Sequence, residues 1–114
     1  MSTNADWTVD EMSGLLATVR QDNEADLASA RATLADAAAD GTVAAGNLVG
    51  VLAAAENMVE DAETILAAVD VAEQRLADGT YGQCASCGGD IGGDRLRVRP
   101  WVRECVACAG AHGH

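Results

Sequence analysis

The sequence predicts a mainly α-helical protein, in which an antiparallel two-helix coiled-coil hairpin is followed by a small zinc-binding module. One observation is an alanine-rich, seven-residue apolar repeat before residue 80, which is typical of packed helices. The other is two C-x-x-C pairs after residue 80, which can supply four thiolates to one metal ion. We expect the hairpin to span residues 1–79 and the metal module residues 80–114, with a flexible C-terminal tail.

The first helix is expected over residues 9–39. Thr8 and Glu11 have the spacing of a capping box, in which the Thr8 hydroxyl accepts a hydrogen bond at the start of a helix. Apolar residues then recur at steps of three and four, which indicates one buried face: Val9, Met12, Leu15, Leu16, Val19, Leu27, Ala30, Leu34 and Ala37.

Residues 40–46 are expected to form the tip of the hairpin. Two glycines lie within six residues, next to Asp40 and Asn47. Such a cluster interrupts helices. Gly41 suits the position just after the end of a helix, where a left-handed backbone conformation is common.

The second helix is expected over residues 47–78 and has the more regular repeat. Its a positions are Leu48, Ala55, Ala62, Val69 and Leu76, and its d positions are Val51, Met58, Ile65 and Ala72. This pattern predicts a coiled-coil seam over four heptads. Leu52, Val59 and Leu66 widen the apolar stripe, and we expect them to cover the first helix or the metal module. Gly79 is a natural C-terminal cap.

All four cysteines are expected to bind one metal ion: Cys84, Cys87, Cys105 and Cys108, with 17 residues between the pairs. A closed four-sulfur site leaves no position for substrate or water, so we predict one structural Zn²⁺ ion. Disulfides are the alternative, but no secretory signal precedes the chain and the rest does not resemble a disulfide-stapled miniprotein. The ligands alone leave iron open, because thiolates bind both metals.

Charge is distributed unevenly along this chain of net charge −11. Residues 1–79 carry 15 acidic side chains against three arginines, whereas residues 80–114 carry four arginines against three acidic side chains. Phosphates would repel such an acidic hairpin, so direct DNA reading is not expected, and a basic protein surface or channel is the favoured partner. The alternative is a solvated face that only maintains solubility.

The chain is expected to lie in the cytoplasm and not in a membrane. Its N-terminus lacks the basic segment of an export signal, and no apolar run is long enough to cross a bilayer. No enzymatic activity is expected, because no serine–histidine–acid set and no phosphate-binding glycine loop is present.

The C-terminal segment resembles the DksA/TraR-type C4 zinc-finger family, C4 meaning four cysteine ligands. The resemblance lies in Tyr81-Gly-Gln-Cys84-Ala-Ser-Cys87-Gly with the residues before it, in Ile91, Arg95-Leu and Arg99-Pro, and in the second cysteine pair. It covers about the last 40 residues, whereas the hairpin is similar only in architecture. It implies a monomeric regulator that binds RNA polymerase and inserts its coiled coil into the secondary channel to modulate initiation. Some members act with the nucleotide alarmone ppGpp.

Five residues are candidate partner-binding residues: Asp36, Asp40, Arg95, Arg97 and Arg99. The best-known members carry two aspartates three apart at the tip, followed by an alanine. Asp36 and Asp40 are four apart and are followed by Gly41, so the tip is diverged. Their alternative role is as solvated charges at a helix end.

The three arginines alternate with Leu96 and Val98. In a strand they would share one face and could contact an acidic patch or a phosphate backbone. Alternatively they pair with Asp90, Asp94 or the hairpin.

Three hypotheses of function follow. The chain is a polymerase-binding regulator with a diverged tip, an acidic coiled-coil adaptor with a structural zinc site and another partner, or a nucleic-acid-binding finger that uses the arginine strand.

Overall fold

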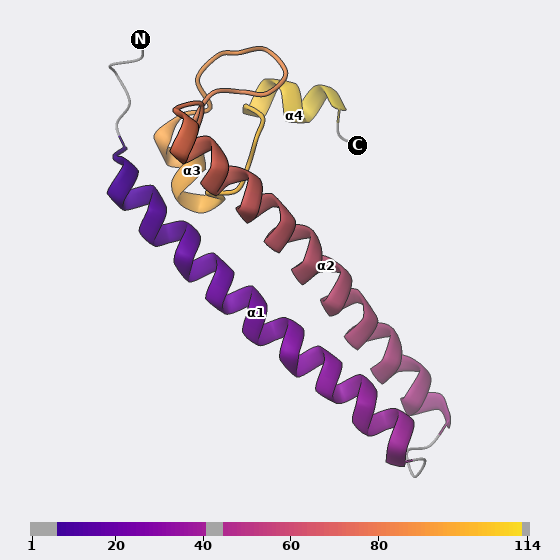
Figure 1. Ribbon diagram of the computed structural model, residues 1–114. Coiled ribbons are helices and arrows are strands. Elements are labelled where there is room, and N and C mark those ends of the chain that lie inside the picture. Colours follow the sequence, from indigo (N-terminus) through magenta and orange to yellow (C-terminus); the bar gives the residue numbers. More distant parts are fainter. Residues whose placement is uncertain (1–6, 41–44, 113–114) are drawn as a thin grey trace. The chain divides into compact units, whose positions relative to one another are not determined.

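The computed structural model describes residues 7–40 and 45–112, and these form four helices. They are α1 (Val9–Asp40), α2 (Ala45–Asp78), α3 (Gly93–Val98) and α4 (Val106–His112) (Figure 1). Within the described residues the only β-type pairing is an isolated antiparallel bridge between Gln83 and Asp90. No described helix is long and apolar enough to cross a membrane. The predicted fold class, two long helices followed by a four-cysteine module, is confirmed.

The two long helices are slightly longer than the apolar repeat indicated. α1 extends to Asp40, and α2 begins at Ala45 rather than at residue 47. Of the segment expected as the tip, 40–46, residues 40, 45 and 46 therefore belong to helices, and residues 41–44 lie outside the described part of the chain. α2 ends at Asp78, and Gly79 has φ +86° and donates its N–H to the Arg75 carbonyl at 2.9 Å. This is the C-terminal cap that Gly79 predicted.

The chain divides into two compact units. The first, here called the base unit, consists of Met1–Val19 and Ala68–His114. The second, here called the arm unit, consists of Arg20–Ala67. The base unit therefore contains the start of α1, the end of α2 and the whole cysteine-bearing segment.

In the arm unit, α1 and α2 run side by side in opposite directions (Figure 1). Four alanines form the buried contact between them: Ala30, Ala37, Ala55 and Ala62. Small side chains let two helices approach closely. An ion pair joins Arg31 Nη2 to Glu63 Oε2 at 2.8 Å, but both side chains are more than half exposed. Such surface pairs contribute only about 0–1 kcal/mol, so burial of the alanine seam holds the arm together.

The buried stripe of α2 in the arm unit is narrower than the apolar repeat predicted. The a positions Ala55 and Ala62 are buried, but the d positions Val51 and Met58 remain 41% and 42% exposed. A single partner helix covers only a narrow stripe of its neighbour. With alanine at the centre of that stripe, the larger side chains lie along its margins.

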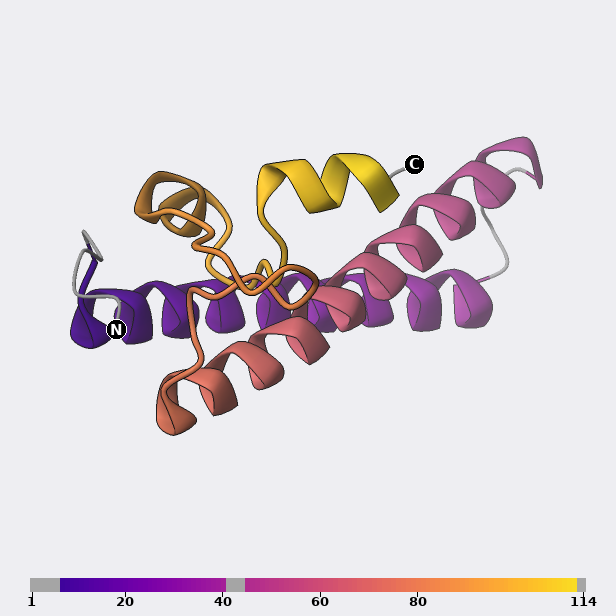
Figure 2. The same cartoon turned by 90° about the horizontal axis from the view of Figure 1, so that it is seen from above.

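The core of the base unit is built from both long helices and from α3. Met12, Leu16, Val69 and Leu96 are fully buried. These side chains come from α1, α2 and α3, so the cysteine-bearing segment is packed on the ends of the long helices by burial of apolar surface. Figure 2 shows α3 and α4 as separate short helices joined by residues 99–105.

Two aromatic rings close one side of this core. Trp7 meets Tyr81 edge to face, with ring centroids 5.1 Å apart, a favourable arrangement for aromatic pairs. The Tyr81 hydroxyl donates to the Pro100 carbonyl at 2.8 Å, and burial raises the pKa of Tyr81 to about 12. Gly82 has φ +88°, and a Cβ atom there would lie 2.7 Å from the Trp7 ring. Only glycine fits this position without displacing Trp7.

Candidate metal centre

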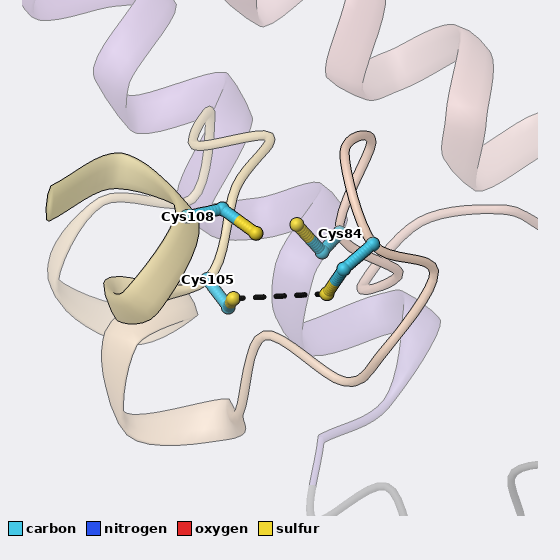
Figure 3. A group of neighbouring side chains, drawn as sticks. Cys84, Cys105 and Cys108 are labelled. Carbon is cyan, nitrogen blue, oxygen red and sulfur yellow. Dashed lines mark hydrogen bonds between the residues drawn. The ribbon is translucent and has the colours of Figure 1, made fainter. Parts of the chain in front are cut away.

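The structure brings the four cysteines together. The four Sγ atoms all lie within 4.8 Å of one another; they belong to Cys84, Cys87, Cys105 and Cys108. The sulfur atoms of Cys84, Cys105 and Cys108 point toward one another in Figure 3. The Sγ atoms of Cys87 and Cys105 are 3.9 Å apart, and none of the four forms a disulfide. A tetrahedral zinc ion with Zn–S bonds of about 2.3 Å separates its sulfur ligands by roughly 3.8 Å, so the geometry fits zinc.

A tight loop presents the first cysteine pair. The amide of Cys84 donates to the Gly89 carbonyl at 2.7 Å, and the amide of Gly88 donates to the Cys84 carbonyl at 2.9 Å. Gly88 makes the reversal with φ +77°, a conformation that costs glycine little. The Gly89 amide then donates to Cys87 Sγ at 3.4 Å. This loop brings the sulfur atoms of Cys84 and Cys87 within 4.8 Å of each other.

The second pair is presented by the start of α4. The Ala109 amide donates to the Cys105 carbonyl at 2.9 Å, so Cys105 immediately precedes the helix and Cys108 follows within its first turn. Residues three apart lie on the same face of a helix, which directs both thiols toward the first pair. The segment between the two pairs contains α3.

Neighbouring groups shift the pKa values of Cys84 and Cys108 in opposite directions. Backbone hydrogen bonds, first that of Cys105 and then those of Cys87 and Ser86, lower the pKa of Cys84 to about 6. Hydrogen bonds with the other three thiols, Cys84 first, raise the pKa of Cys108 to about 12. A bound metal ion would replace these shared protons, because coordinating thiols are deprotonated. Zinc would supply the cross-link that holds the two pairs together.

Comparisons with known proteins agree with this geometry. The sequence model of the family described as "Prokaryotic dksA/traR C4-type zinc finger" matches residues 79–113. A solved structure described as transcription factor DksA2 from Pseudomonas aeruginosa is similar with a TM-score of 0.77 and 26% identity, over 91% of this chain and 81% of that chain. Residues 79–113 form a zinc finger of the DksA/TraR type. The site therefore holds one structural Zn²⁺ ion in a DksA/TraR-type C4 finger.

One curated protein is also similar to part of the chain. An uncharacterized protein of Aquifex aeolicus (strain VF5) is 44% identical over 41 residues, which is 36% of this chain. The matched region spans only 28% of that relative. The likeness therefore covers only part of either protein.

Arg95 and Arg97 lie on a helix and not on a strand, and Arg99 directly follows that helix. Leu96 is fully buried whereas Val98 is 76% exposed, although a strand would place both on one face. The alternation of arginines with Leu96 and Val98 is compatible with a strand, but burial of Leu96 in the base unit selects the helix α3 (Gly93–Val98). The expected arginine strand was therefore wrong.

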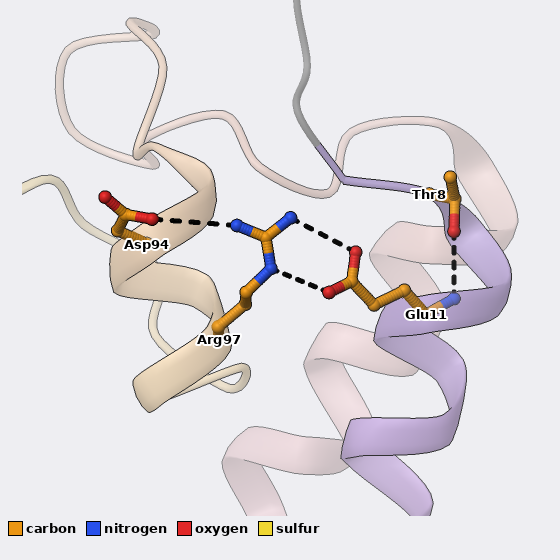
Figure 4. Close-up of polar contacts among 4 residues, drawn as sticks. All are labelled: Thr8, Glu11, Asp94 and Arg97. Atoms are coloured by element: carbon orange, nitrogen blue, oxygen red, sulfur yellow. Dashed lines mark hydrogen bonds and ion pairs between the residues drawn. The ribbon is translucent and has the colours of Figure 1, made fainter.

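Two of these three arginines make contacts within the base unit. Arg95 Nε donates to the Glu104 carbonyl at 3.0 Å. Arg97 Nε donates to Glu11 Oε2 at 2.7 Å, and Arg97 Nη1 lies 3.6 Å from Asp94 Oδ1 (Figure 4). Arg99 is exposed. The interpretation in which these arginines pair with Asp94 or the hairpin thus describes Arg97.

The candidate aspartates belong to the arm unit. Asp36 is exposed on α1, and Asp40 is the last residue of α1. The side chain of Asp40 and the turn at 41–44 lie outside the described residues. The arginines belong to the base unit, so the candidate partner-binding residues are divided between the two units.

Two residues of the finger that lie next to the cysteines were assigned no role from the sequence. Ser86 Oγ donates to Glu104 Oε2, and the Glu104 carbonyl accepts from Arg95. Ser86 lies between the two cysteines of the first pair, and Glu104 immediately precedes Cys105. No local pattern signals their pairing, because they are 18 residues apart.

Glu11 connects α1 to α3 as well as beginning α1. Its amide donates to Thr8 Oγ1 at 3.0 Å, which confirms Thr8 as the cap. Its carboxylate binds Arg97 rather than the Thr8 amide (Figure 4). The hydrogen bond from Arg97 is the main cause that lowers the pKa of Glu11 below its usual 4.5.

The Glu11–Arg97 contact predicts a pH-dependent contribution to stability. Because folding lowers the pKa of Glu11, its contribution is present above pH 4.5 and is lost as the pH falls through the lowered pKa. We expect Glu11→Gln to be less stable than the wild type at neutral pH, with a difference that narrows as the pH is lowered, as measured by urea unfolding of the zinc-loaded proteins. Asp10→Asn, which removes a charge from the same helical turn, is the control. A constant difference between Glu11→Gln and the wild type at all pH values would contradict the contact.

Proposed function

We propose that this chain is a transcription regulator that binds RNA polymerase and modulates initiation by inserting its acidic hairpin into the secondary channel. The observation that carries the proposal is the likeness to a transcription factor over 91% of the chain, which includes the hairpin as well as the finger. The proposal places the protein in the cytoplasm as a monomer. The proposal includes a nucleotide alarmone as co-regulator only because of the resemblance to the DksA/TraR-type family.

The surface of the arm unit supports a basic partner. Eight of its acidic side chains are exposed: Asp22, Glu24, Asp26, Asp36, Glu56, Glu60, Asp61 and Glu63. Arg31 is the one exposed basic side chain among the described residues of that unit. A field of this sign attracts a positively charged channel and repels nucleic-acid phosphates.

The finger supports the proposal as a structural element. Four sulfur ligands leave zinc no open position for water or substrate, so we propose no enzymatic activity. The finger instead joins α1, α2 and α3 within the base unit through one buried core. That arrangement holds together the ends of the two helices that form the hairpin.

The test compares the intact chain with a variant whose residues 39–46 are replaced by a glycine–serine turn. We expect both proteins to bind core RNA polymerase, with affinity that falls as salt is added. Only the intact chain should alter initiation in a reconstituted transcription assay. Absence of binding by both proteins, while each retains its zinc and helical signal, would reject the proposal.

A second candidate function is an acidic adaptor with a partner other than polymerase. The exposed apolar side chains Val49, Val51 and Met58 of α2 favour it, since apolar side chains are contact points in interfaces. The same assay separates the two candidates, because an adaptor would leave transcription unchanged. The hypothesis of a finger that binds nucleic acid through an arginine strand is not supported, because Arg95 and Arg97 lie on the helix α3.

A further inference from the structure

Hydrogen bonds join the two cysteine pairs independently of any metal. Both residues between Cys84 and Cys87 take part. The Ala85 amide donates to the Arg103 carbonyl at 2.7 Å, and Ser86 Oγ donates to the carboxylate of Glu104. The two acceptors immediately precede Cys105, so the first loop is connected to the backbone that leads into the second pair.

Glu104 is also held by α3. Arg95 Nε donates to the Glu104 carbonyl at 3.0 Å in a partly buried contact, and Leu96, the next residue of α3, is fully buried in the base unit. A helix anchored in the core thus fixes the main chain at Glu104. The Glu104 side chain then reaches the first loop through Ser86.

We propose that the Ser86–Glu104 bridge, supported by Arg95, positions the two cysteine pairs relative to each other and thereby strengthens zinc binding. Zinc must draw four thiolates from two loops into one tetrahedron. A connection that already sets the spacing of the loops reduces the conformational freedom that binding removes. Groups that orient metal ligands in this way typically change metal affinity by 10–100-fold when they are removed.

The charge of Glu104 and its role in the bridge predict opposite changes in zinc affinity when its side chain is removed. Four thiolates and one Zn²⁺ ion carry a net charge of −2, and a neighbouring carboxylate disfavours the accumulation of that charge. If the charge of Glu104 dominated, its removal would raise zinc affinity. If the bridge to Ser86 dominates, its removal lowers zinc affinity. The sign of the change therefore identifies the role.

The experiment measures the zinc dissociation constant of the full chain by competition with a chromogenic chelator. We expect Ser86→Ala and Glu104→Ala each to weaken zinc binding about 10-fold. The double variant should lose no more than either single variant, because both remove the same bridge. Glu104→Gln keeps an acceptor for the Ser86 hydroxyl and should retain wild-type affinity or exceed it. Glu24→Ala, which removes an exposed carboxylate from α1, is the charge-matched control.

The absorption of the Co²⁺-loaded proteins provides a second readout. Its visible bands report a tetrahedral four-sulfur site, and we expect them to weaken or broaden in Ser86→Ala and Glu104→Ala but not in Glu104→Gln. Unchanged zinc affinity in Ser86→Ala, a small substitution on the surface, would overturn the proposal. Additive losses in the double variant, or an increase in affinity on Glu104→Ala, would also overturn it.

Discussion

Replacing Cys105 by serine is expected to abolish stoichiometric zinc binding and to unfold the finger, with the helical hairpin of the arm unit retained. A structural zinc site contributes about 10–16 kcal/mol of binding free energy in zinc-finger peptides at neutral pH, and that energy is folding energy. The arm unit draws its stability from the alanine seam, and all four cysteines belong to the base unit. Zinc content and far-ultraviolet circular dichroism measure the two parts of this prediction.

Chelation of zinc from the wild-type chain is the matching control, because it removes the ion without changing a residue. It should give the same spectrum as Cys105→Ser. Amide signals of the finger should collapse toward random-coil positions, whereas those of the arm unit should remain dispersed. Loss of the entire helical signal with the metal would contradict an arm that folds on its own seam. Retention of zinc by Cys105→Ser would contradict the four-sulfur site.

Replacing Leu96 by alanine is expected to destabilise the base unit by about 2–5 kcal/mol, the range for removing a fully buried leucine side chain. Leu96 has no exposed surface and lies on α3, between the two cysteine pairs of the finger. Its loss would leave a cavity among side chains from α1 and α2. Urea unfolding of the zinc-loaded protein, followed by fluorescence of its two tryptophans, measures the change.

Val98→Ala is the control within the same helix. Val98 is 76% exposed, so its substitution should change the free energy of unfolding by no more than about 0.5 kcal/mol. In a strand the two side chains would lie on the same face and would have similar effects. Equal losses for Leu96→Ala and Val98→Ala would therefore contradict the helical assignment of this segment.

The long helices and the cysteine cluster were predictable because their signals are local. Heptad spacing in α2 predicts a buried stripe over many turns, and Ala55, Ala62, Val69 and Ala72 are indeed buried. Each C-x-x-C pair is contained in one loop or one helical turn. Gly79, just after α2, is likewise identified as a C-terminal cap from its immediate neighbours in the sequence.

α3 was missed because six residues are too few to show a helical period. Arginine and aliphatic residues alternate there, which is the pattern of a strand. Burial of Leu96 among residues distant in the sequence decides the conformation instead. Tertiary packing commonly overrides local preference in this way.

The surroundings of the metal site were missed for the same physical reason. Glu104 meets Ser86 across 18 residues, and Arg97 meets Glu11 across 86 residues. The type and spacing of these residues fit many pairings. Only the fold selects one of them.

The most direct test of the proposed function is photo-crosslinking from position 36. Asp36 is exposed on α1, about one turn from the end of that helix, and can be replaced by a photoreactive amino acid. With core RNA polymerase, the account predicts crosslinks to residues that line the secondary channel, and competition by the unmodified chain. Crosslinks confined to the outer surface of the polymerase, or none at all, would contradict insertion of the hairpin.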